Sequence, residues 1–157
     1  MKKGYRLLIA IVLFSLPLLT VAQSDSIRLA CPLKDAIVVP PPKNAIKYDP
    51  PDLCVVLMSK PDSIVKAVAA GRITNTEVDE EGRYGVVLFA RLKGKDYYFW
   101  YTGMNKATVS RNTIVKAGDP LGFISPGEKI EMLMFQFETP LDPSKYLDCG
   151  SVLKTED

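Results

Sequence analysis

The chain has 157 residues, among them 20 basic and 18 acidic residues and no histidine. A balanced charge excludes the strongly basic surface that nucleic-acid binding requires, and the length suits one domain with a real core. Without histidine, the usual general base and the commonest zinc ligand are both missing.

Residues 1–22 have the pattern of a secretory signal peptide. Basic residues precede an apolar run from Leu7 to Thr20, and Val21-Ala22-Gln23 offers a cleavage site after Ala22. A membrane anchor is the alternative, but a run of about 14 residues is short for a bilayer core that needs about 20. The signal carries three basic residues and no acidic one, so cleavage leaves a net charge of −1. We therefore expect export to the periplasm or the extracellular space, with membrane attachment only through an uncleaved signal.

Three cysteines would remain after cleavage: Cys31, Cys54 and Cys149. In an oxidising compartment two of them can form a disulfide, and the sequence does not decide which two. No two are close enough for a Cys-x-x-Cys unit. Structural thiols or one disulfide therefore fit better than a zinc site.

Residues 23–53 are expected to form an extended, proline-rich leader rather than part of the core. Pro40-Pro41-Pro42 and Pro50-Pro51 lack backbone donors and disfavour helix. Asp35–Val39 can add one edge strand. We expect the leader to wrap along the domain; the alternative is a ligand for a polyproline-binding partner.

Residues 54–150 are expected to form a single β domain, followed by a tail at 151–157. Short apolar or alternating runs separated by turn residues predict strands, and no segment after the signal has sustained helical periodicity. The expected strands are Cys54–Met58, Ser63–Ala69, Arg72–Val78, Tyr84–Leu92, Asp96–Thr102, Val109–Lys116, Leu121–Ile124 and Lys129–Glu138. The fold class is therefore all-β, a β-sandwich of antiparallel sheets.

Six short motifs follow one another between Ala67 and Leu147. They are Ala67-Val68-Ala69-Ala70-Gly71, Tyr84-Gly85-Val86-Val87-Leu88, Tyr98-Phe99-Trp100-Tyr101, Val115-Lys116-Ala117-Gly118-Asp119-Pro120-Leu121-Gly122, Phe135-Gln136-Phe137-Glu138 and Asp142-Pro143-Ser144-Lys145-Tyr146-Leu147. In type and order they resemble the lysostaphin-type (LytM-like) zinc metallopeptidases, the murein endopeptidase family. The resemblance implies a duplicated hybrid-motif β-sandwich and, in the family, a zinc ion that serves to cut peptidoglycan cross-bridges.

The resemblance also implies where the zinc chemistry would lie, and those positions lack the residues for it. The first ligand pair of the family, His and Asp, corresponds to about Asp52 and Val56. Its His-x-His pair corresponds to Met134 and Gln136, and a further catalytic histidine to Gly103. Gln136 is a weak ligand, and one carboxylate at Asp52 cannot hold zinc or activate water. We therefore predict a pseudoenzyme with no catalytic residue, no metal and no cofactor.

Alternation along Lys129–Glu138 assigns side chains to two faces. Leu133, Phe135 and Phe137 are expected on the core face, and Met134 and Gln136 on the floor of the family's groove. This apolar floor either packs under a loop such as the leader or forms an adaptable peptide-binding surface. The resemblance places Tyr101 beside the groove as a candidate binding residue, whereas Phe99 is expected in the core.

Three functional hypotheses follow. Some exported relatives with lost metal sites regulate cell-wall hydrolases or bind peptidoglycan, so the resemblance favours a cell-envelope binding or regulatory module with peptidoglycan or such a hydrolase as partner. A structural or interaction domain for another exported protein is the alternative. An active peptidoglycan hydrolase with a non-standard site is the least favoured. It would require, for example, a carboxylate pair drawn from Asp52, Asp79, Glu131 and Glu138.

Overall fold

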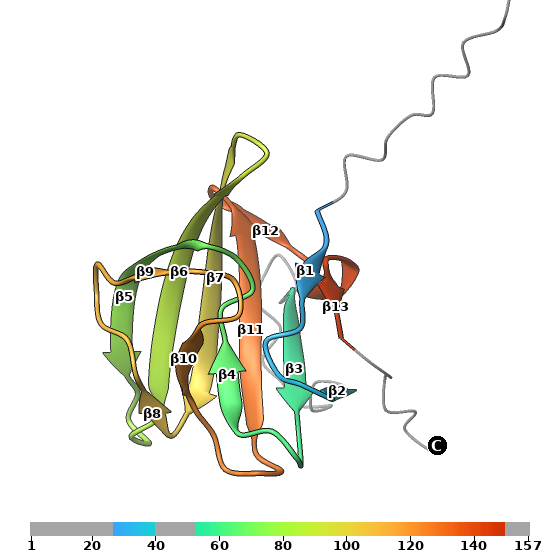
Figure 1. The fold of residues 1–157 in the computed structure, drawn as a ribbon, viewed down its shortest axis with the longest axis vertical. Coiled ribbons are helices and arrows are strands. Elements are labelled where there is room, and N and C mark those ends of the chain that lie inside the picture. The colour runs from blue at the N-terminus through green and yellow to red at the C-terminus, as the bar shows by residue number, and fades with distance from the viewer. Residues whose placement is uncertain (1–26, 40–52, 150–157) are drawn as a thin grey trace, which may run out of the picture.

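The computed structural model describes residues 27–39 and 53–149, which form short strands and one 3₁₀ turn (Figure 1). The all-β class predicted from the sequence is confirmed. Within these residues, no helix is long and apolar enough to cross a membrane. The expected signal peptide, both proline clusters, Asp52 and the tail at 151–157 lie outside the described residues.

A large antiparallel sheet forms one layer of the fold. Its strand order is β2-β3-β11-β7-β6-β5-β9, and β12 also pairs with β11. The strands are β2 (Ile37–Val39), β3 (Cys54–Met58), β5 (Gly71–Val78), β6 (Tyr84–Leu92), β7 (Lys95–Met104), β9 (Ile114–Val115), β11 (Lys129–Gln136) and β12 (Thr139–Leu141).

A smaller sheet, β4 (Ile64–Lys66), β10 (Pro120–Phe123) and β8 (Lys106–Ala107), lies in front of β6, β7 and β11 in Figure 1. Two further short strands, β1 (Leu29–Ala30) and β13 (Leu147–Asp148), pair in parallel. The 3₁₀ turn η1 (Pro143–Lys145) precedes β13, and the side chain of Asp142 caps it by accepting a hydrogen bond from the Ser144 N–H. The core lies between the large sheet and these elements.

The central strands follow directly from their sequences. β6 and β7 form a hairpin in which Leu92 pairs with Lys95, so the connecting turn is Lys93-Gly94. Both turn residues have positive φ (48° and 76°), as a two-residue type I′ turn requires. Buried side chains alternate along β7 at Tyr97, Phe99 and Tyr101, so this strand directs one face into the core.

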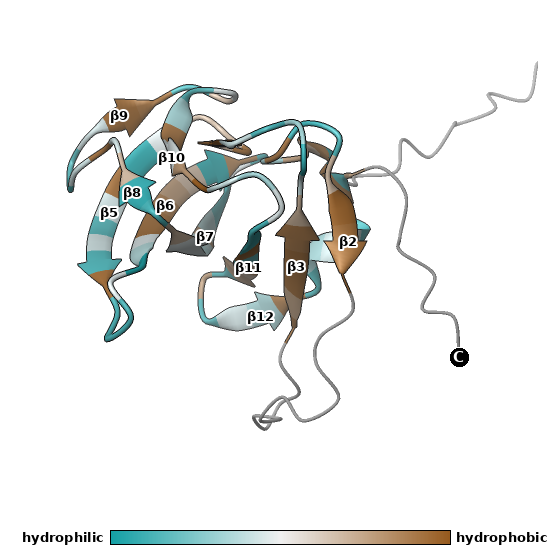
Figure 2. Ribbon diagram, turned by 90° about the horizontal axis from the view of Figure 1, so that it is seen from below, coloured by the Kyte–Doolittle hydropathy of each residue, from teal (hydrophilic) through white to brown (hydrophobic). Residues whose placement is uncertain are grey.

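Part of the expected leader belongs to the core instead. We call residues 27–39 the N-terminal strap. Leu29, Leu33 and Ala36 of the strap are buried in the same apolar cluster as the central strands. β2, at the end of the strap, pairs with β3 as the edge strand that the sequence predicts, and both strands are apolar along their length (Figure 2).

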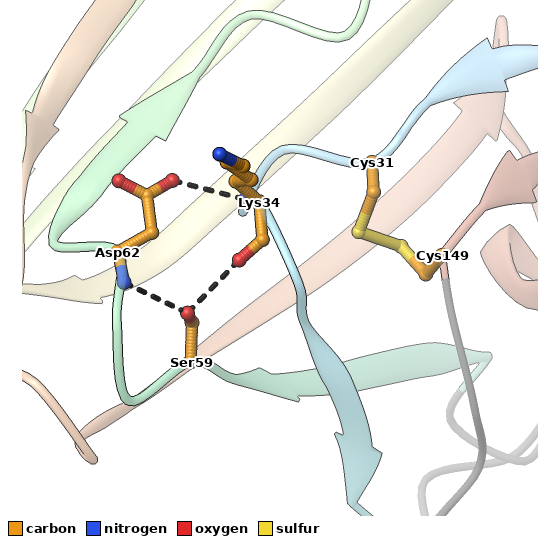
Figure 3. The surroundings of a disulfide bond; sticks show 5 residues. All are labelled: Cys31, Lys34, Ser59, Asp62 and Cys149. Carbon is orange, nitrogen blue, oxygen red and sulfur yellow. Dashed lines mark hydrogen bonds between the residues drawn. A yellow bond between two sulfur atoms is a disulfide. The ribbon is translucent and has the colours of Figure 1, made fainter.

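A disulfide between Cys31 and Cys149 fixes the strap to the segment after β13 (Figure 3). Cys54 takes no part in this bond. Nearby, the Ser59 hydroxyl donates to the Lys34 carbonyl at 2.9 Å, and the Lys34 N–H donates to the Asp62 carboxylate at 2.9 Å. The Lys66 N–H of β4 also donates to the Pro32 carbonyl at 2.9 Å. The strap is therefore hydrogen-bonded to the loop between β3 and β4 and to β4 itself.

Two expected strands, Cys54–Met58 and Tyr84–Leu92, have the predicted bounds, and the others are shifted, extended or shortened at their ends. Two differences have a clear physical reason. The expected strand Val109–Lys116 is reduced to β9, because Ser110 and Thr113 form a turn joined by backbone and side-chain hydrogen bonds. Pro140 was expected to end the last strand, but it lies within β12. β12 pairs only with β11 among the described strands, and such an edge position tolerates a residue without an N–H.

Candidate functional site

The site positions implied by the sequence lie on three neighbouring strands of the large sheet. Val56 is on β3 and pairs with Glu131 of β11. Met134 and Gln136 are on β11, and Tyr101 and Gly103 are on β7.

The strand register separates these positions. Met134 pairs with Phe99, and Gln136 pairs with Tyr97. Gly103 lies four residues beyond Phe99 on β7, which corresponds to about 13 Å along an extended strand. The structure therefore does not bring Gly103 together with the Met134–Gln136 pair.

Gly103 also offers no room for the imidazole that the family would place there. Its φ is +88°, and a Cβ atom would lie 2.9 Å from the Lys129 carbonyl oxygen. Any side chain would have to displace that backbone. The glycine is thus explained by its conformation and by the close approach of β11.

The two faces of β11 are the reverse of the expectation. Met134 is fully buried with Ile130 and Met132, whereas Phe137 is 66% exposed. Leu133 and Phe135 are half-buried on the opposite face. The alternation itself was predicted correctly, but both faces are apolar, so the sequence pattern could not show which of them meets the second layer.

The methionine face is therefore core rather than an open groove floor. Met132 and Met134 belong to the cluster that contains Leu33 and Ala36 of the strap. These positions are therefore packed in the interior and do not form an open peptide-binding surface.

Tyr101, the expected binding residue, is also fully buried. Its hydroxyl oxygen accepts a hydrogen bond from the Val68 N–H at 3.1 Å. Burial raises the pKa of this phenol well above its usual value. Tyr101 therefore has a structural role, and Phe99 is in the core as expected.

The residues at the implied zinc positions do not fit a zinc ion. Met134 is a buried thioether. The side chain of Gln136 accepts a hydrogen bond from the Tyr97 hydroxyl at 3.4 Å, and Val56 has no donor atom. Across residues 27–39 and 53–149, no group of three or more Cys, Asp or Glu side chains is arranged to hold a metal. This donor set cannot supply the nitrogen and oxygen ligands that catalytic zinc requires.

Two surface hollows lie on the large sheet, and the first includes two of the implied site positions, Val56 and Gly103, in its lining. The first, the polar cleft, has a volume of about 530 Å³ and is lined by Val56, Asp79, Glu81, Arg83, Thr102, Gly103, Gly127, Glu128, Lys129, Ile130 and Glu131. Arg83 and Glu128 form a bidentate ion pair in this cleft, with N···O distances of 2.8 and 3.1 Å. The Arg83 hydrogen bonds, aided by the Ser125 N–H, lower the pKa of Glu128 to about 2.

The carboxylates proposed for a non-standard hydrolase do not form one site. Asp79 and Glu131 border the polar cleft, but one Asp79 oxygen already accepts the backbone N–H groups of Glu81 and Arg83 at 2.9 and 2.8 Å. Glu138 lies just beyond the opposite end of β11 and borders the second hollow. Asp79 is thus engaged as a turn residue.

The second hollow, which we call the aromatic groove, has a volume of about 500 Å³. It is lined by Thr74, Asn75, Val87, Tyr98, Trp100, Phe135, Phe137 and Glu138. Sequence reasoning missed it because Phe135 and Phe137 were assigned to the core face. Side chains alternate between the two faces of β7 and β11. Once the buried face is known, this alternation places Tyr98, Trp100 and Phe135 together on the outer face.

Solved structures share this fold at low sequence identity. A chain in the SpoIIQ–SpoIIIAH pore-forming complex aligns with a TM-score of 0.57 and 16% identity, over 77% of this chain and 91% of that chain. A mutant catalytic domain of the prophage-encoded M23 protein EnpA from Enterococcus faecalis gives 0.54 and 13%, over 77% and 96%. LytU gives 0.51 and 18%, over 72% and 81%. At these identities the likeness concerns the fold alone.

Sequence comparison with curated proteins finds no significant match. The sequence model of peptidase family M23, however, matches residues 53–144, from the residue before β3 to the 3₁₀ turn. That match covers more than half of the chain and includes the large sheet from β3 to β12. Together with the strand order and the six motifs, it shows that the chain belongs to peptidase family M23.

Proposed function

We propose that this chain is an exported, non-catalytic member of the M23 family that acts as a binding or regulatory module of the cell envelope. The observation that carries the proposal is Met134, which the resemblance aligns with the first histidine of the family's His-x-His pair and which is fully buried in the core. A buried thioether in a chain without histidine neither binds catalytic zinc nor transfers a proton.

The core packing supports the same conclusion. Tyr101 and Met132 lie beside Met134 on the inner face, and Leu33 of the strap is buried in the same apolar cluster. Single substitutions back to histidine would therefore not rebuild an open site. The family fold is retained, while Met134 at one of the implied catalytic positions is part of the core.

Export is supported by the signal-like first 22 residues and by the Cys31–Cys149 disulfide, because such bonds persist in oxidising compartments. Peptidoglycan or a cell-wall hydrolase is the partner that the family membership favours. The alternative, an interaction domain for another exported protein, is supported by the fold likeness to a chain of the SpoIIQ–SpoIIIAH complex.

Catalysis is tested on protein secreted into an oxidising compartment and purified in the presence of zinc. We expect substoichiometric zinc by elemental analysis and no release of fragments from dye-labelled peptidoglycan, with an active M23 peptidase as the positive control. One zinc per chain together with cleavage of cross-bridges would overturn the proposal.

Binding is tested in two further measurements. The purified chain is sedimented with isolated peptidoglycan, and it is crosslinked in its native envelope so that co-purified proteins can be identified by mass spectrometry. Association with peptidoglycan or with an identified cell-wall hydrolase supports the proposed role. If only an exported protein unrelated to the cell wall is recovered, the interaction-domain alternative replaces it.

A further inference from the structure

The outer face of the large sheet carries a row of four aromatic side chains. The ring centroids of Phe89 and Tyr98 are 5.3 Å apart, and those of Trp100 and Phe135 are 5.8 Å apart. Tyr98 and Phe135 are register partners on β7 and β11, so the two pairs form one row. Because the rings are tilted by 52° and 48°, they present ridges and slots instead of a flat surface.

The aromatic groove lies along this row and stays open to solvent among the described residues. Trp100 is 41% exposed, and Phe137 at the rim is 66% exposed. Aromatic residues contribute more binding energy at interfaces than most residue types. Exposed apolar patches rimmed by polar residues are a feature of interaction and ligand-binding sites.

The backbone of Phe137 adopts a left-handed conformation, which is unfavourable for a bulky side chain. Gln136 pairs with Thr139, so Phe137 and Glu138 form a two-residue turn between β11 and β12. The φ of Phe137 is +54°, at the first central position, where such turns favour glycine. A bulky, exposed residue kept in the left-handed region points to a role in binding.

The groove chemistry suits a proline-rich peptide. Four of its eight lining residues are aromatic: Tyr98, Trp100, Phe135 and Phe137. Aromatic-lined grooves bind polyproline II segments, which lose little conformational entropy on binding. The Tyr98 hydroxyl and the Trp100 indole N–H are donors of the kind that such peptides' carbonyl groups accept.

Charge adds a second requirement. Glu138 is exposed at the end of the groove, and it is the only charged side chain among the described lining residues. We propose that the aromatic groove binds a proline-rich peptide that carries a basic residue, supplied by another exported protein. This inference rests on the proposed function, because it identifies the surface through which a non-catalytic domain would bind its partner.

The single tryptophan of the chain, Trp100, provides a direct readout. The intact secreted chain is titrated with a synthetic peptide of three Pro-Pro-Pro-Lys repeats, and Trp100 fluorescence is followed. We expect saturable binding, weakened at least about tenfold by Phe137→Gly. Because glycine suits the turn, this variant should unfold at the same temperature as the parent or higher. Phe123→Ala, on β10 of the small sheet, removes another exposed aromatic side chain and should leave the affinity unchanged.

A charge exchange tests the basic residue. Glu138→Lys should weaken binding of the Pro-Pro-Pro-Lys peptide and improve binding of a Pro-Pro-Pro-Glu peptide. Equal affinity of Phe137→Gly and the parent, or saturable binding of a peptidoglycan glycan fragment but not of the proline peptide, would overturn the inference. Self-association that is lost when Pro40, Pro41 and Pro42 are replaced by alanine would also overturn it, since the occupant would then be the chain itself. Zinc content and peptidoglycan cleavage, measured on the same preparation, report separately on the proposed function.

Discussion

Cys31 and Cys149 join the two sequence ends of the described domain, 118 residues apart, beside the parallel pairing of β1 with β13. Their bond holds the strap where Leu29 and Leu33 enter the core. In this chain, the segment before the family-matching region is thus a structural part of the domain.

Replacing both disulfide cysteines with serine should lower the free energy of unfolding by about 2–5 kcal/mol. The bond closes a long loop, and its loss increases the conformational entropy of the unfolded chain. Urea unfolding under oxidising conditions measures the change. Cys54→Ser retains the disulfide and serves as the control; equal midpoints for the double variant and the parent would show that the bond does not hold the strap in place.

Tyr101→Phe should destabilise the domain by about 1–3 kcal/mol, because the buried Val68 N–H would lose its acceptor. Tyr98→Phe, on the opposite face of β7, is the matched control and should change the stability by much less. Thermal and urea unfolding of both variants give the comparison.

The raised pKa of Tyr101 also predicts a loss of stability in alkali. Above a pH of about 10, the tyrosine of the unfolded chain ionises, while the buried phenol stays protonated. The unfolded state is therefore favoured increasingly as the pH rises through this range. Tyr101→Phe should show a shallower decline than the parent in urea unfolding between pH 9 and pH 11, and parallel declines would contradict the assignment.

Met134→Lys distinguishes a buried position from an open groove floor. Because Met134 is fully buried, an unpaired ammonium group there should cost on the order of 3–5 kcal/mol and leave little folded protein. Leu133→Lys places the same charge on the half-exposed opposite face and should be far better tolerated. Equal stability of the two variants by circular dichroism and urea unfolding would mean that the Met134 face is accessible.

The sequence predicts strands best where turn chemistry marks both ends. β3 and β6 have the expected bounds, and Gly94 identifies the hairpin between β6 and β7. The site was harder to predict for physical reasons. β11 is apolar on both faces, so periodicity alone could not identify the buried one, and three cysteines leave the pairing open. The separation of Gly103 from Met134 depends on the β7–β11 register, which motif spacing does not determine.

The Arg83–Glu128 ion pair predicts a defined acid dependence. Its partners hold the pKa of Glu128 at about 2, below the ordinary value of 4.5. A lowered folded-state pKa stabilises the protein at pH values above 4.5, and this contribution is lost as the pH falls from about 4.5 towards 2. Glu128→Gln should therefore be less stable than the parent at pH 7 and equal to it near pH 2. Both side chains are about one-third exposed (31% and 33%), so added salt should reduce the difference at pH 7.

Urea unfolding across this pH range measures the effect, with Glu131→Gln, another acidic residue of the same cleft, as the control. A stability difference that persists unchanged at pH 2 would show that Glu128 contributes through packing and not through its charge.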